Sequence, residues 1–109
     1  MRILLINHFP LEGSGSGIYT KNLAKELSRK GHKVKVIFPE HQNITDKDFE
    51  TRAIIFKGKN NIEYEVNFNF PCFTSHPRSN NTFYKLNSEQ IREYIKIMVD
   101  TTQEEADEF

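Results

Sequence analysis

The chain has 109 residues, of which 37% are hydrophobic and 28% are charged, and its formal net charge is zero. This length allows one domain with a modest core. The apolar runs are far shorter than the roughly 20 residues of a membrane-spanning helix. They are also shorter than the ~7–15 residues at the centre of a signal peptide. The sequence therefore predicts a cytoplasmic protein with no transmembrane segment, and it leaves peripheral attachment to a membrane open.

Composition also limits the ligands that the chain can bind. A lone cysteine, Cys72, excludes an internal disulfide, and the histidines lack the spacing of a metal site. We therefore predict no metal and no cofactor. Bases outnumber acids over residues 1–87, but Lys21, Lys25 and Arg29 have the spacing of one solvated helix face. No nucleic-acid-binding motif accompanies them, so we predict no nucleic-acid partner.

A short strand and a glycine-rich loop open the chain. Residues 2–7 are mostly apolar, which is typical of a strand buried on both faces of a parallel sheet. The loop that follows, at residues 13–17, leads into a helix that we expect to begin near Gly17. Ser16 is the expected N-cap of that helix, because a serine hydroxyl can accept a hydrogen bond from the first turn.

The first helix leads into a second strand. Tyr19, Leu23 and Leu27 recur at i, i+4 and i+8, and together with Ala24 they predict the buried face of the helix. Gly31 can adopt the left-handed conformation that ends a helix. An alternating segment at residues 34–38 then predicts a strand. A strand–helix–strand connection of this length is almost always a right-handed parallel crossover.

Residues 52–70 predict an antiparallel hairpin. The first strand covers residues 52–57, and a turn separates it from residues 62–70, where apolar and polar side chains alternate with a period of two. We therefore predict an α/β fold, with a Rossmann-like, three-layer parallel core and an added antiparallel hairpin.

The last helix has a clear start and a weak end. Asn87 is a suitable N-cap, and Gln90 stands three residues later as in a capping box. The apolar stripe fades at Thr101, and we expect the acidic end, residues 103–109, to fray.

The glycine-rich loop is a candidate phosphate site. Backbone N–H groups at the start of a helix bind anions, and glycine lets a ligand approach the backbone closely. The candidate phosphate-binding residues are Gly13, Gly15, Ser16 and Gly17. An ordinary flexible connection fits the same residues. Ile18 occupies the place where a P-loop needs its second glycine, so that motif is absent.

A dinucleotide is an alternative ligand for this loop. The fingerprint G-x-G-x-x-G, counted from Gly13, needs a third glycine where Ile18 stands. Glu40 lies near the end of the second strand, where an acid that binds ribose would sit. Pro39 beside it favours an ordinary loop residue.

Two histidines are candidates for ligand contacts. His8 follows the first strand, at the edge where open parallel sheets bind ligands. His76 lies in a loop beside Arg78, and together they could contact a hydroxyl or an anion. Both histidines are equally consistent with exposed loop residues.

These segments resemble the N-terminal domain of GT-B glycosyltransferases of the family 4 type. Such enzymes open with a hydrophobic strand, a proline and a glycine pair, followed by L-A-x-x-L and G-H-x-V-x-V. The matching segments are Phe9-Pro10, Gly15-Ser16-Gly17, Leu23-Ala24-Lys25-Glu26-Leu27 and Gly31-His32-Lys33-Val34-Lys35-Val36. The resemblance covers residues 1–40 well and residues 62–99 loosely. Ser14 departs from it, because a glycine often stands there.

The resemblance implies a retaining glycosyltransferase that transfers a sugar from a nucleotide-sugar donor to a sugar or lipid-linked acceptor. Residues 1–109 would form part of the N-terminal, acceptor-side domain, with the glycine loop against the donor diphosphate. The residues that would line the acceptor side are His8, Tyr19, His76 and Arg78. By the same resemblance no metal is needed.

The family's later histidine and its glutamate-rich second-domain motif have no counterpart in this sequence. We therefore expect no catalytic residue in this chain, a second Rossmann domain in cis or in trans, and no activity of the chain alone. Two other interpretations stay open: a small Rossmann-like nucleotide or dinucleotide module, and a non-catalytic interaction fragment. An uncovered sheet edge would favour oligomerisation or poor solubility.

Overall fold

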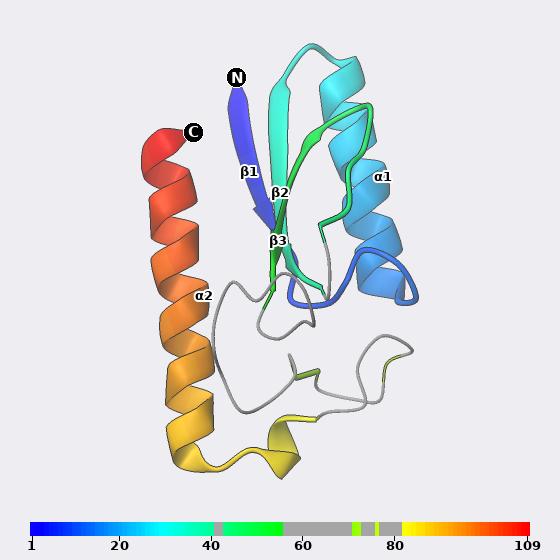
Figure 1. Cartoon of the computed structure of the whole chain (residues 1–109). Helices are drawn as coiled ribbons and strands as arrows, with labels where there is room; N and C mark the ends of the chain where they lie inside the picture. The colour runs from blue at the N-terminus through cyan, green and yellow to red at the C-terminus, as the bar shows by residue number, and fades with distance from the viewer. Residues whose placement is uncertain (41–42, 56–70, 73–75, 77–81) are drawn as a thin grey trace.

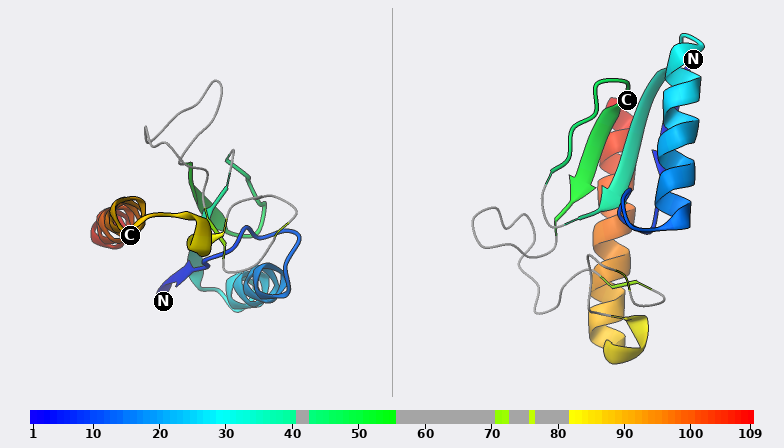
Figure 2. Two further views of the ribbon diagram at one scale, coloured as in Figure 1. Left: turned by 90° about the horizontal axis from the view of Figure 1, so that it is seen from below. Right: turned by 90° about the vertical axis from the view of Figure 1, so that its right-hand side faces the viewer.

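The protein is a three-layer α/β structure in which two helices cover opposite faces of a parallel sheet (Figures 1 and 2). The computed structural model describes residues 1–40, 43–55, 71–72, 76 and 82–109. The elements are β1 (Arg2–Ile6), α1 (Gly15–Arg29), β2 (Lys33–Pro39), β3 (Glu50–Ile54), the short 3-10 helix η1 (Phe83–Lys85) and α2 (Ser88–Glu108). The predicted α/β class and parallel core are confirmed. No described helix is both long and apolar enough to cross a bilayer.

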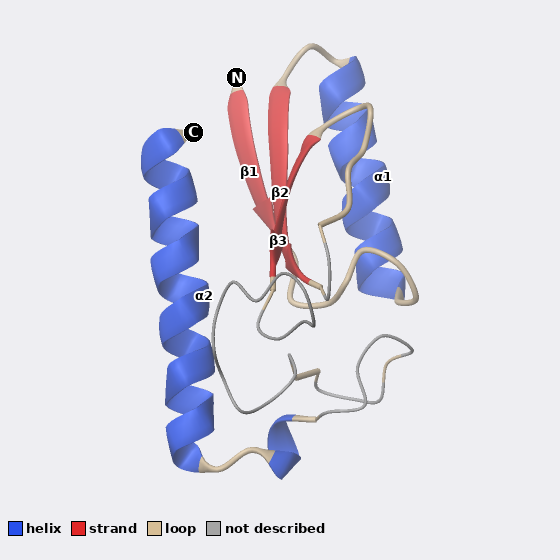
Figure 3. Ribbon diagram, in the orientation of Figure 1, coloured by secondary structure: helices blue, strands red, loops and turns tan. Residues whose placement is uncertain are grey.

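The sheet has the order β1-β2-β3, and both pairs of neighbouring strands are parallel (Figure 3). Arg2 pairs with Lys33 at the start of β1, and Lys35 pairs with Glu50 at the start of β3. The central position of β2 explains its apolar sequence, because a central parallel strand is covered on both faces.

Alternate residues of β2 enter two different cores. The core on the α1 side contains Leu11, Ala24, Val34, Val36, Phe38, Phe49, Ala53 and Ile55. The core on the α2 side contains Ile37, Ile54, Cys72, Tyr94 and Ile97. Successive side chains of a strand point to opposite faces, so Phe38 packs toward α1 while Ile37 packs toward α2.

The first helix begins two residues earlier than the sequence predicts. Its N-cap is Ser14, whose hydroxyl accepts a hydrogen bond of 3.0 Å from the N–H of Gly17. Ser14 has extended backbone angles, as an N-cap needs, whereas Ser16 already lies inside the helix. The prediction of Ser16 as the cap is therefore wrong.

The end of α1 follows the prediction. Gly31 has a φ of +92°, which is the left-handed conformation that favours glycine. Its N–H donates to the carbonyl of Ser28 at 3.0 Å, and the N–H of His32 donates to the carbonyl of Leu27 at 3.2 Å. This pair of bonds is a Schellman motif, which satisfies the last carbonyls of the helix.

The buried face of α1 follows the prediction except at Tyr19. Ala24 is buried in the core on the α1 side, and Leu27 packs against the same core. Tyr19 is 71% exposed, so its predicted place on the buried face is wrong. Gly17 is buried as well, but it packs against the loop that precedes the helix.

The predicted antiparallel hairpin is wrong over its first strand. Residues 50–54 form β3, which pairs in parallel with β2. Local alternation does not reveal strand direction, and the parallel arrangement buries Ala53 in one core and Ile54 in the other. Residues 56–70, which include the second strand of that prediction, lie outside the described residues.

The last helix begins as predicted and ends later. The N–H of Gln90 donates to the Asn87 side chain at 2.9 Å, and the N–H of Asn87 donates to the Gln90 side chain at 3.0 Å, which confirms the capping box. The helix does not fray at Gln103 but continues to Glu108. Glu105 is buried against the sheet, and this contact orders the acidic end.

Candidate functional site

The loop between β1 and α1 is held in place by Asn7, a buried residue directly after β1. The N–H of Asn7 donates to the carbonyl of Ile37 at 2.8 Å, and its side-chain amide donates to the carbonyl of Phe9 at 2.7 Å. Thr20 in α1 donates its hydroxyl to the Asn7 side-chain oxygen at 3.0 Å. Asn7 therefore ties the sheet, the loop and the helix together. The sequence signal for this role is the position of Asn7, a polar residue that directly follows the apolar residues of β1.

The glycines of the loop differ in backbone conformation and in packing. Gly13 has a φ of +84°, in the left-handed region. A side chain at Gly17 would place its Cβ 2.3 Å from the carbonyl oxygen of Pro10 and 2.7 Å from that of Leu11. A Cβ at Gly15 would meet no heavy atom within 4 Å. Gly17 therefore serves packing, whereas the backbone at Gly15 borders open space.

The predicted phosphate-binding residues lie together at the N-terminus of α1. Gly15 and Ser16 are the first two helical residues, so their N–H groups have no acceptor within the helix. The positive end of the helix dipole adds to their attraction for an anion. The N–H of Gly17 is already used by the side chain of Ser14. The first-turn donors are thus Gly15 and Ser16, and phosphate binding by the loop stays a prediction.

The two candidate histidines contact the same aromatic ring. The rings of His8 and Phe9 have centroids 4.3 Å apart, and the rings of Phe9 and His76 stack at 5.6 Å. His76 is buried, unlike the exposed loop residue that one interpretation expected, whereas His8 is exposed. Tyr19 is exposed on the first turns of α1. Arg78 lies outside the described residues.

Glu40 is fully buried, with an exposed fraction of 0%. Its N–H donates to the carbonyl of Ile54 at 3.2 Å, so it continues the strand pairing beyond Pro39. A ribose hydroxyl could reach this carboxyl only by displacing protein. The structure therefore does not support Glu40 as the ribose-binding acid of a dinucleotide module.

Residues 11–108 match the starch synthase catalytic domain. The chain belongs to this family. It is therefore part of a glycosyltransferase catalytic domain of the starch synthase type. Comparisons with curated proteins and with solved structures give no match. The family supports the GT-B fold and the glycosyltransferase class that the sequence resemblance implied, but it does not support family 4.

The match with the starch synthase family covers most of the candidate site. The range 11–108 includes the glycine loop, Tyr19 and His76, whereas His8 lies before it. Gly15 and Ser16 at the start of α1 therefore lie within the part of the chain that matches the family.

Two ionisable side chains of the core on the α2 side, Cys72 and Tyr94, have raised pKa values. Cys72 is buried, and burial raises the pKa of its thiol to about 11. The same packing, and secondarily the charge of Cys72, raises the pKa of Tyr94 to about 12. Both groups stay neutral near pH 7. Across the described residues, no cluster of three or more His, Cys, Asp or Glu could hold a metal ion.

Proposed function

We propose that this chain forms the acceptor-side, N-terminal part of a retaining glycosyltransferase that transfers a sugar from a nucleotide-sugar donor to a glucan. The family match over residues 11–108 is the observation that carries this proposal. The geometry supports it, because the start of α1 presents unengaged N–H groups beside the carboxyl end of β1. Open parallel sheets bind ligands at that edge.

The glycine loop would receive the diphosphate of the donor. As the bond between the sugar and the diphosphate breaks, negative charge develops on the leaving phosphate. The N–H groups of Gly15 and Ser16 would stabilise that charge without rearrangement, because Asn7 and the Ser14 cap already fix the loop. Gly13 would allow the turn that brings the loop to this position.

The acceptor would lie on the side of the exposed residues near this loop. His8 and Tyr19 could exchange hydrogen bonds with sugar hydroxyl groups, because an imidazole and a phenol can each donate and accept. His76 is buried and would act by supporting Phe9, against which it stacks. Arg78 stays a candidate from the sequence.

The remaining parts of the reaction would come from a second Rossmann domain, supplied in cis or in trans. This chain would contribute no catalytic residue and need no metal, and we expect it to transfer no sugar alone. A non-catalytic interaction role remains the alternative if no nucleotide binds.

A titration of the ¹⁵N-labelled chain with UDP, ADP and NAD tests the proposal. A nucleoside diphosphate should shift the amide signals of residues 13–18, even at millimolar affinity, and the nucleoside alone should not. Gly15→Ala should weaken this response without unfolding the chain, because a Cβ there meets no neighbour. Loop signals that stay unmoved by every diphosphate would contradict the donor-loop role.

A further inference from the structure

Helix α2 carries two stripes of mainly apolar residues, and only one of them is buried. The buried stripe consists of Tyr94, Ile97, Thr101 and Glu105. The second stripe consists of Ile95, Val99, Thr102 and Ala106. Its largest side chains are exposed, Ile95 by 52% and Val99 by 59%. A helix that only covers a sheet needs one apolar stripe, so the second stripe indicates a further contact surface.

The spacing of the second stripe is that of a contact between helices. Its members follow one another at intervals of four, three and four residues. The a and d positions of a coiled coil alternate in the same way. The stripe is about 17 Å long, since each residue adds 1.5 Å to a helix. This length accommodates one short helix pair, and we expect its affinity to be low.

The second stripe borders a shallow groove at the edge of the sheet. The lining residues of the groove are Ile6, Met98, Val99, Thr102, Gln103 and Ala106. Ile6 belongs to β1, which is an edge strand of the described sheet, and it is 53% exposed. Figure 1 shows α2 alongside β1 at one side of the molecule, and no other described element covers the groove there.

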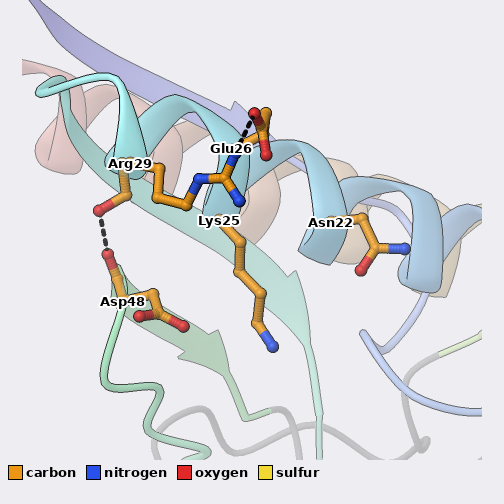
Figure 4. Close-up of a pocket in the computed structure, with 6 residues that line it drawn as sticks. Asn22, Lys25, Glu26, Arg29 and Asp48 are labelled. Carbon is orange, nitrogen blue, oxygen red and sulfur yellow. Dashed lines mark hydrogen bonds and ion pairs between the residues drawn. The ribbon is translucent and has the colours of Figure 1, made fainter.

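Another hollow, beside the last turns of α1, differs from this groove in its lining (Figure 4). Lys25 and Arg29 of α1 lie on one of its sides, and Asp48 lies on the other. Charged residues are depleted at the centres of protein interfaces. The lining residues of the groove along α2 are all uncharged, so the groove is the better surface for a protein partner.

The charges of α2 indicate which partner fits the groove. Residues 88–97 contain two bases and two acids, whereas residues 98–108 contain five acids and no base. Arg92 lies seven residues before Val99 and therefore on the same side of the helix. A second α2 in the antiparallel direction would place its Arg92 beside the acidic end of the first. A parallel copy would bring two acidic ends together, which is unfavourable.

We infer that a second copy of this chain packs its α2 antiparallel against the second stripe, around a two-fold axis at Val99. Val99 then contacts Val99 of the second copy. Arg92 approaches Asp107 of the second copy, and the two-fold axis repeats this contact at the other end. The lining of the groove includes no residue of the glycine loop, so the inference is independent of the proposed function.

Reversal of charges tests the antiparallel direction, with sedimentation velocity of the full chain over a range of concentrations. Arg92→Glu and Asp107→Lys should each raise the dissociation constant of the dimer about tenfold, because each replaces two attractive contacts by two repulsive ones. The double variant should restore the original dissociation constant. Lys30→Glu is the matched control, since Lys30 is exposed and lies outside the groove, and it should have no effect.

Restoration in the double variant can arise only between two chains. Residues 92 and 107 of one helix lie about 22 Å apart. This separation is about twice the Debye length of roughly 10 Å at 0.1 M salt, so the two charges of one chain interact little.

Cysteine cross-linking provides a second measurement. Val99→Cys should form a disulfide between two chains, because the two-fold axis brings both copies of residue 99 within the Cα separation of about 7 Å that a disulfide allows. Ile95→Cys should not, since its two copies would be displaced by about 12 Å along antiparallel helices. The natural cysteine, Cys72, is buried, and the unmodified chain measures its background.

Three results would overturn the inference. A chain that remains monomeric at every concentration would assign the second stripe to a different partner. A double charge variant as weak as either single variant would exclude contact between Arg92 and Asp107. Cross-linking of Ile95→Cys as efficient as that of Val99→Cys would indicate parallel helices.

Discussion

At the scale of single residues, Gly15 and Gly17 lie two positions apart, but only Gly17 has no room for a side chain. Gly17 packs beneath the carbonyl groups of Pro10 and Leu11, whereas Gly15 borders open space. The same two glycines looked alike in the sequence, where both were candidates for phosphate binding. The difference arises from a contact with the preceding loop, and no local pattern encodes that contact.

Gly17→Ala should destabilise the chain by about 1–3 kcal/mol, because its Cβ would overlap the carbonyl groups of Pro10 and Leu11, the first of which accepts a hydrogen bond from Ser14. Gly15→Ala is the matched control and should change the free energy of unfolding by less than about 1 kcal/mol. Urea denaturation of both variants measures the difference. Equal stability of the two variants would contradict the packing role of Gly17.

Cys72 should make the stability of the chain sensitive to alkaline pH. Burial raises the pKa of its thiol from 9.0 to about 11, so the folded state keeps a proton that the unfolded state loses first. The stabilisation is therefore complete below about pH 9 and is lost as the pH rises through about 11.

The measurement is the free energy of unfolding at neutral pH and near pH 11. Cys72→Ala should show a smaller loss across this range than the unmodified chain. Some loss should remain, because burial also raises the pKa of Tyr94. An equal loss in both proteins would show that Cys72 does not titrate with folding.

At the scale of secondary structure elements, ion pairs hold the acidic C-terminal end of α2 against the sheet. Glu105 pairs with Arg52 of β3 at 3.1 Å and also with Lys35 of β2. Arg2 of β1 donates to the carbonyl oxygen of Phe109 at 3.0 Å, so the end of α2 contacts all three strands. These contacts explain why residues 103–108, which the sequence predicted to fray, are helical.

Glu105→Gln should destabilise the chain by about 1–3 kcal/mol, because it leaves two partly buried cations without their counter-charge. Glu104→Gln is the matched control, since Glu104 is exposed on the same turn, and its effect should stay within about 0.5 kcal/mol. Thermal unfolding at low and at high salt checks the prediction. A cost for Glu104→Gln as large as that for Glu105→Gln would refute the specific role of Glu105.

The elements with local signals could be predicted from the sequence. The capping box of Asn87 and Gln90 and the helix end at Gly31 depend on residues within a few positions of each other. The direction of β3 and the role of Glu105 depend on partners far away in the sequence, so neither could be read from periodicity. For the candidate site, the position of the loop was predictable, whereas the buried state of His76 required the fold.

At the scale of the whole molecule, helices cover the two faces of the sheet, and β1 is an edge strand among the strands that the structure describes. β1 pairs with β2 on one side, and no described strand pairs with its other side. Beside this edge lies a shallow, mainly apolar groove lined by Ile6, Met98, Val99, Thr102, Gln103 and Ala106. A free strand edge next to exposed apolar side chains promotes association between chains.

The isolated chain should therefore self-associate as its concentration rises, and Val99→Lys should reduce that association. Val99 is 59% exposed in α2, so a lysine there adds charge to the groove without disturbing the core. Tyr84→Lys is the matched control, because Tyr84 is 91% exposed and lies outside the groove. Sedimentation velocity over a range of concentrations measures the change. A monomer at all concentrations would show that this edge does not drive association. An equal effect of both lysine variants would assign association to general charge, because only contact through the groove distinguishes Val99 from Tyr84.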